Sequence, residues 1–155
     1  MAHFPLNAWY AAACDVALGR SLPARTSCNQ NLVLHRLEDG APAALEDACR
    51  HRLLPLSMGR LEGDEVVCGY HGLVFNAAGR CTHMPSQETL NPSACVRSYP
   101  VRQKHRLVWV WPGDPALAGE ASIPDLHWND DPGWTDDGRM IGVKCDCRLV
   151  IDKLI

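Results

Sequence analysis

The sequence predicts a mainly β protein, built as a small antiparallel sandwich or barrel, with a short α+β tail. Two observations favour this class. Short runs rich in β-branched and aromatic residues recur between turns that contain Gly or Asp. Little of the chain has the periodicity of an amphipathic helix, and its 155 residues suffice for one domain, or one domain plus a fragment, with a real core.

The expected strands are short and follow one another closely. A strand at residues 9–12 opens the chain, and a second at 31–36 ends at the turn pair Asp39-Gly40. Residues 43–46 and 65–67 each lead into a loop that carries one Cys and one His. The later expected strands are 73–75, 96–101, 107–111 and, after a connector rich in Pro and Asp, 140–150.

Alternation along the strand 107–111 places Trp109 and Trp111 on one face, with Val108 and Val110 on the other. We expect core packing on both faces rather than stacking of a Trp ring on a cofactor.

The charge and hydropathy of the chain exclude several classes of function. A formal net charge of −3 gives no basic excess with which to bind nucleic acid. No apolar run approaches the ~20 residues that a membrane span needs. The mildly apolar segment 11–18 is interrupted by Asp15 and has no basic region before it, so it does not predict a signal peptide. We expect a cytoplasmic protein.

Four residues form two mixed pairs, Cys49 with His51 and Cys68 with His71. Two thiolates and two imidazoles suit either a tetrahedral zinc ion or a Rieske iron–sulfur cluster. Zinc fingers usually pair Cys with Cys and His with His, whereas a Rieske cluster uses two Cys on one iron and two His on the other. The mixture therefore favours the cluster, and Gly residues beside the second pair would let the backbone approach the cluster sulfides.

The remaining cysteines and histidines carry weaker signals. Without a secretory signal, the other cysteines are expected to be reduced, in the core or near the surface. Cys145 and Cys147 would share one face of the last expected strand. The other histidines have no paired neighbour at ligand spacing, and we expect surface or ordinary hydrogen-bonding roles for them. These residues are Cys14, Cys28, Cys81, Cys95, Cys145 and Cys147, and His3, His35, His83, His105 and His127.

The chain resembles the Rieske non-haem iron oxygenases, and in particular the oxygenase components of the vanillate O-demethylase and dicamba demethylase type. The resemblance rests on Cys49-Arg50-His51-Arg52 and on Cys68 to Leu73, and it extends over nearly the whole chain. It includes Asn7 to Tyr10, Trp109 to Asp114 and Cys145 to Ile155. Arg50 departs from the family pattern, which has Pro at this position.

The resemblance implies a Rieske-type fold at 1–113, with Cys49, His51, Cys68 and His71 as ligands of a 2Fe-2S cluster. It also implies a connector and the incomplete start of a catalytic domain at 114–155. High-potential Rieske proteins have an additional Cys in each loop and a Ser hydroxyl that donates a hydrogen bond to a bridging sulfide. The two loops of this chain have neither. We therefore expect a reduction potential toward the lower end of the roughly −150 to +300 mV Rieske range.

In the family, a Rieske cluster receives electrons singly from a reductase or ferredoxin and passes them to a mononuclear ferrous iron. The parent activity is O-demethylation of a methoxylated aromatic acid, in a homotrimer that this chain alone is not expected to form. Asp152 matches the residue before the iron-binding motif, and Lys153 replaces its usual Asn. The bridging Asp and both His would follow Ile155, so no catalytic residue is assigned and the end is interpreted as a cut.

Two alternatives remain at this point. The first is a free-standing Rieske ferredoxin, against which the catalytic-domain-like tail argues. The second is a structural zinc domain. The basic residues Arg50 and Arg52, and the stretch 102–106, could attract an acidic electron-donor protein, although a solvated surface is the preferred interpretation of 102–106.

Overall fold

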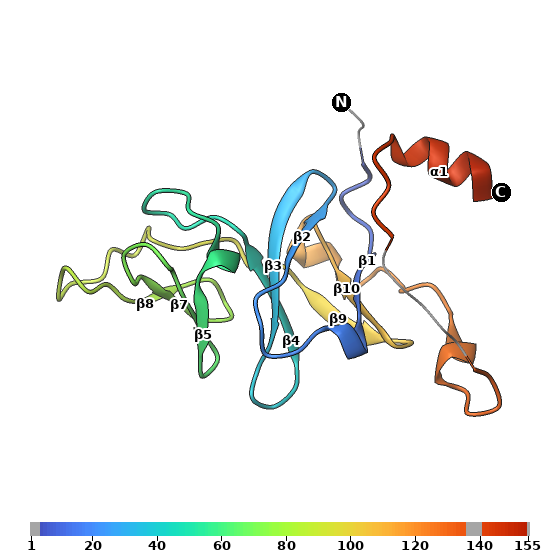
Figure 1. Cartoon of the computed structure of the whole chain (residues 1–155), viewed down its shortest axis with the longest axis horizontal. Coiled ribbons are helices and arrows are strands. Elements are labelled where there is room, and N and C mark those ends of the chain that lie inside the picture. The colour runs from blue at the N-terminus through green and yellow to red at the C-terminus, as the bar shows by residue number, and fades with distance from the viewer. Residues whose placement is uncertain (1–3, 136–140, 155) are drawn as a thin grey trace.

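The computed structural model describes residues 4–135 and 141–154, and it confirms a mainly β, antiparallel architecture. Its strands form three sheets, two of three strands and one of four. Figure 1 shows the four-stranded sheet at one end, the sheet β2-β3-β4 in the middle and the sheet β1-β10-β9 beyond it.

The first three-stranded sheet joins the two ends of the Rieske-like region. Strand β1 (Tyr10–Cys14) pairs with β10 (Leu107–Val110), which pairs in turn with β9 (Val101–Lys104). The middle sheet contains β2 (Ala24–Ser27), β3 (Gln30–Arg36) and β4 (Pro42–Glu46), all antiparallel.

The middle sheet is buried on both of its faces, because successive side chains of β3 point in opposite directions. Leu32 and Leu34 pack into one apolar cluster with Val108 and Val110 of β10. Val33, between them, packs into a second cluster that includes the four-stranded sheet. This arrangement explains why β3 is apolar almost throughout its centre, and it couples the ligand-bearing end of the molecule to the rest.

The four-stranded sheet contains β5 (Arg60–Glu62), β6 (Glu65–Val67), β7 (Val74–Phe75) and β8 (Cys81–His83). These strands are very short, and their apolar side chains join the second cluster. The loop between β4 and β5 and the loop between β6 and β7 carry the Cys–His pairs.

A third apolar cluster confirms the expected packing of the tryptophans. Trp9, Trp109 and Trp111 are buried together with Ala118 and Ile123, which belong to the segment after the last strand of the sheet. This segment contains the short 3-10 helices Pro115–Leu117 and His127–Asp130. The connector thus packs against the sheet across the expected boundary at residue 113, which itself stays a prediction.

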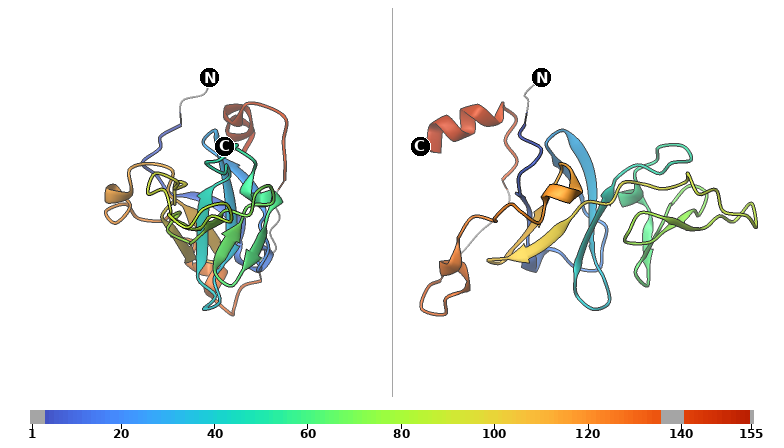
Figure 2. Two further views of the ribbon diagram at one scale, coloured as in Figure 1. Left: turned by 90° about the vertical axis from the view of Figure 1, so that its left-hand side faces the viewer. Right: turned by 180° about the vertical axis from the view of Figure 1, so that it is seen from behind.

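Two of the expected strands are wrong. Within residues 96–100 only Ser98 forms an isolated bridge, to Leu45, and the strand β9 begins at Val101, after Pro100. In the tail, Cys147–Leu154 is the helix α1 rather than a strand, at the end of the molecule away from the four-stranded sheet (Figure 2).

The helix α1 begins where Asp146 supplies an N-terminal cap. Its Oδ1 accepts a hydrogen bond from the backbone N–H of Arg148 at 3.0 Å, and a carboxylate at this position also interacts favourably with the helix dipole. Cys145 and Cys147 consequently do not share a strand face, because Cys145 precedes the helix and Cys147 begins it. Residues 136–140, the start of the expected strand 140–150 included, lie outside the described part of the chain. Within 4–135 and 141–154, no helix has both the length and the apolar character to cross a membrane.

Candidate metal centre

The two ligand loops share one backbone design. The N–H of Cys49 donates to the carbonyl of Leu54 at 2.8 Å, and the N–H of Leu53 donates back to the carbonyl of Cys49 at 2.8 Å. In the second loop, the N–H of Cys68 donates to the carbonyl of Leu73 at 2.8 Å, and the N–H of Gly72 donates to the carbonyl of Cys68 at 3.1 Å. Each loop is thus closed at its base, with the Cys at the point of closure.

Each loop also turns through a residue in the left-handed region four positions after its Cys. Gly72 has φ 72° and Leu53 has φ 58°. Glycine adopts this conformation without steric cost, whereas a residue with a side chain is strained in it. Leu53 is therefore in a strained conformation, which the hydrogen bond from its N–H to the carbonyl of Cys49 stabilises.

The two thiols lie inside the protein. Cys49 is 1 % exposed and Cys68 is 2 % exposed, and both belong to the apolar cluster around the four-stranded sheet. Burial raises the pKa of the Cys49 thiol to about 11, the backbone N–H groups of His51 and Arg52 oppose this by donating toward its sulfur, and the adjacent Cys68 thiol raises it further. The two thiols therefore lie near one another in a buried, apolar environment.

The two imidazoles lie at the surface, close together. His51 and His71 are exposed, and their ring centroids are 4.4 Å apart with 60° between the ring planes. The ring of Tyr70 lies beside that of His71, with centroids 3.8 Å apart. The two predicted Cys ligands thus share one buried apolar cluster, and the two predicted His ligands lie together at the surface.

The glycine beside the second pair has a structural role besides the expected one. A side chain at Gly69 would place its Cβ 2.7 Å from the carbonyl oxygen of Met58, which is too close for any residue but glycine. Gly69 therefore lets the second loop approach the backbone at Met58. The expectation that it lets the backbone approach the cluster sulfides stays a prediction.

Sequence reasoning missed the residue that supports the first loop. Asp47 is 8 % exposed, and its carboxylate accepts hydrogen bonds from the N–H and the hydroxyl of Ser57, both at 2.7 Å. A buried carboxylate with two such donors holds the start of the loop to its end. The position of Asp47, two residues before Cys49, could have marked it as a candidate support for the loop. Its partner Ser57, ten residues later, was not predictable from a local pattern.

A hollow of about 440 Å³ opens beside the imidazoles, lined in part by Arg50, His51, His71, Leu73, Met84 and Pro85. It gives the surface around the imidazoles a concave shape. In the described residues, 4–135 and 141–154, no three His, Cys, Asp or Glu side chains gather as a mononuclear metal site would require.

The other histidines differ among themselves. His105 is buried and contacts Asp130, so its expected hydrogen-bonding role is confirmed. His35 contradicts the expectation, because it is fully buried and neither of its ring nitrogens has a hydrogen-bond partner. His3 lies outside the described residues. The described cysteines outside the two pairs are free and intermediate or exposed in burial: Cys14, Cys28, Cys81, Cys95 and Cys145.

The comparison with known families decides between a cluster and zinc. Residues 8–100 match the Rieske 2Fe-2S domain. The chain belongs to this family. Its resident cofactor is accordingly a Rieske 2Fe-2S cluster, and two buried thiols beneath two exposed imidazoles fit the donor set that this cluster requires.

Longer oxygenase proteins contain regions similar to this Rieske chain. An iron–sulfur subunit of a toluene-4-sulfonate monooxygenase system from Comamonas testosteroni is 43 % identical over 153 residues, which are 98 % of this chain and 44 % of the relative. The vanillate O-demethylase oxygenase subunit of Pseudomonas sp. (strain ATCC 19151) is 44 % identical over 128 residues, 83 % of this chain and 39 % of the relative.

Solved structures of oxygenases also contain a region similar to this chain. A crystal structure of dicamba monooxygenase bound to dicamba superposes with a TM-score of 0.93 at 42 % identity, covering 99 % of this chain and 49 % of that one. Another crystal structure of dicamba monooxygenase contains non-heme iron. The chain thus spans less than half the length of these relatives.

Proposed function

We propose that Cys49 and Cys68 bind one iron of the cluster and that His51 and His71 bind the other. The observation that carries this assignment is how the two loops meet. The Cys of each loop is buried in the same cluster, and the exposed His of one loop lies beside the exposed His of the other. The matched closure of both loops supports the same assignment, because it presents each Cys and its His in a similar way.

The protein groups around the site suit electron transfer. A Rieske cluster accepts and donates one electron at a time when it is bound. The apolar surroundings of Cys49 and Cys68 keep water from the sulfur side. The exposed rings of His51 and His71 leave a short path between the site and a partner protein, so the histidine side is the proposed route for the electron.

We infer that this chain serves as the electron-carrying part of a monooxygenase or O-demethylase that acts on an aromatic compound. The names of the relatives support this inference, since they are oxygenase subunits or components. In this proposal a reductase or ferredoxin supplies electrons, and a mononuclear iron outside this chain consumes them beside the substrate. We assign residues 1–113 to the Rieske domain and 114–155 to the connector and the incomplete start of the catalytic domain. We place the protein in the cytoplasm, where its free thiols would stay reduced.

Anaerobic reductive titration of the reconstituted protein tests the electron-carrying role. The oxidised protein should take up one electron per chain, bleach its visible absorption and give a rhombic electron paramagnetic resonance signal. Air or ferricyanide should then restore the oxidised spectrum without loss of iron. A colourless protein that contains zinc, or a cluster that cannot be cycled, would overturn the proposal.

A further inference from the structure

The residue between Cys49 and His51 is not a proposed ligand, but its side chain makes two polar contacts beside the proposed cluster site. Arg50 lies between Cys49 and His51, and it lines the hollow beside the two imidazoles. Its Nε donates a hydrogen bond to the carbonyl of Cys95 at 2.9 Å, and its Nη2 contacts the Oε2 of Glu46 at 2.9 Å.

These two contacts fasten the first ligand loop to separate parts of the molecule. Glu46 ends the strand β4, and its own backbone N–H donates to the carbonyl of Arg97 at 2.7 Å. Cys95 is bridged to Arg80, the residue before the strand β8. The planar guanidinium, with donors on several sides, is suited to such a two-point contact, whereas the ammonium of a Lys is a compact point charge.

The pair also places two opposite charges at different positions relative to the site. Arg50 is adjacent in sequence to two of the proposed ligands and borders the hollow that His51 and His71 line. Glu46 does not line that hollow; it lines a second one, which Arg50 also borders but neither imidazole does. Their side chains are 44 % and 30 % exposed, so solvent screens the charges only in part.

A charge near a redox centre shifts its reduction potential, because reduction adds a negative charge to the centre. The nearer cation favours the reduced state, and the more distant carboxylate partly cancels this effect. We propose that Arg50 sets the reduction potential of the site and holds the His51 loop in place, with Glu46 as the opposing charge. This inference rests on the proposed function, since it requires a cluster bound by the two loops.

Three variants of the reconstituted protein separate the electrostatic role from a structural one. Arg50→Gln should lower the midpoint potential, Glu46→Gln should raise it, and the double variant should lie between Arg50→Gln and the wild type. We expect each single change to alter the ratio of reduced to oxidised protein at a fixed potential at least threefold, about 28 mV for one electron. Arg50→Lys, which keeps the charge, should preserve most of the potential.

A matched control is available in Arg20, whose side chain is 42 % exposed and whose partners Glu38 and Asp64 lie at the opposite end of β6 from Cys68. Arg20→Gln should leave the potential unchanged. Unchanged potentials in both single variants, or shifts in the same direction, would overturn the inference. If Arg50→Gln does not retain the cluster, Glu46→Gln alone decides, because its unaltered potential would overturn the inference as well. A wild-type protein without a cluster would instead refute the proposed function.

Discussion

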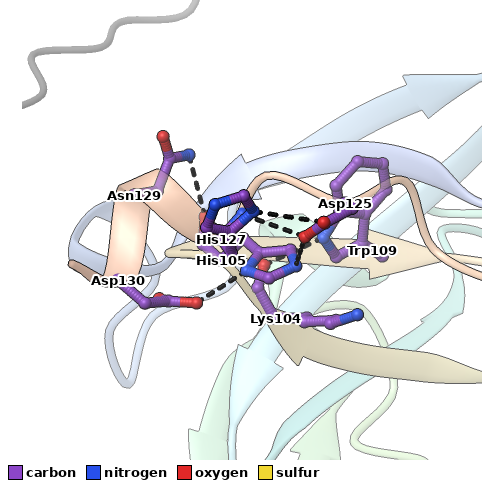
Figure 3. Close-up of polar contacts among 7 residues, drawn as sticks. All are labelled: Lys104, His105, Trp109, Asp125, His127, Asn129 and Asp130. Atoms are coloured by element: carbon purple, nitrogen blue, oxygen red, sulfur yellow. Dashed lines mark hydrogen bonds and ion pairs between the residues drawn. The ribbon is translucent and has the colours of Figure 1, made fainter.

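The Nδ1 of His105 lies 2.6 Å from the Oδ2 of Asp130, and this contact joins the turn between β9 and β10 to the connector (Figure 3). Nearby, the side-chain amide of Asn129 donates to the carbonyl of His105 at 3.2 Å. The Nε2 of His105 faces Asp125 at 3.6 Å, too long for a hydrogen bond but close enough for an ion pair. A buried imidazole thus has a carboxylate on each side, both supplied by the connector.

Removing the carboxylate charge at Asp130 should loosen the connector. Asp130→Asn should lower the free energy of unfolding by about 1 kcal/mol, because the contact is charge-assisted but half exposed to solvent. Limited proteolysis should then cut residues 118–135 faster than in the wild type. Glu120→Gln, an exposed change on the same connector, should leave the cleavage rate unaltered. An unchanged rate in Asp130→Asn would show that the contact does not hold the connector.

His35 should make the fold sensitive to mild acid. Burial lowers its pKa below the ordinary value of 6.5; the nearby Asp64 carboxylate opposes this and Arg20 reinforces it. A depressed pKa means that the unfolded chain binds the proton more tightly, so the contribution to stability is complete above about pH 6.5 and declines as the pH falls. Denaturant unfolding between pH 5 and 8 should show this decline, and His35→Leu should reduce it. An equally steep decline in the variant would assign the pH dependence to other groups.

The midpoint potential of the wild-type protein should lie in the lower part of the roughly −150 to +300 mV Rieske range. The positions after His51 are Arg52 and Leu53, and those after His71 are Gly72 and Leu73, so their side chains bring neither a hydroxyl nor a thiol toward the sulfides. Spectroscopically monitored redox titration measures this value. A midpoint far into the positive part of the range would contradict the argument.

Basic residues near the imidazoles should speed the encounter with an acidic electron donor. Arg52 is exposed beside His51, whereas Lys104 is exposed on the β9–β10 hairpin, which Figure 1 shows away from the ligand loops. Arg52→Glu should therefore slow second-order reduction by an acidic ferredoxin several-fold at low salt and weaken its salt dependence. Lys104→Glu carries the same charge change and should have little effect. Equal effects of both variants, or a rate independent of salt, would remove the steering role.

The proposed ligand residues could be picked out from the sequence because the two Cys–His pairs have a characteristic local spacing. Cys49 and His51, and Cys68 and His71, lie within single loops, and the strands that deliver them are short apolar runs with turn residues at their ends. The supporting contacts were not predictable in the same way. Asp47 with Ser57, and Arg50 with Cys95, join segments that meet only in the folded chain.

The errors have identifiable causes. The apolar run after Cys145 was too short to separate strand from helix by periodicity, and the cap from Asp146 favoured the helix. The burial of His35 could have been predicted, because His35 directly follows the apolar run of Leu32, Val33 and Leu34 in one strand.

The central claim is that two thiols and two imidazoles hold one dinuclear cluster. The most direct test measures iron, acid-labile sulfide and zinc in the wild type and in Cys49→Ser, His51→Ala, Cys68→Ser and His71→Ala, with Cys81→Ser as a control outside the loops. We expect two irons and two sulfides per chain in the wild type and in the control, and loss of the cluster in each ligand variant. A ligand variant that keeps the wild-type iron, sulfide and spectrum, or a wild type that contains zinc alone, would contradict the claim.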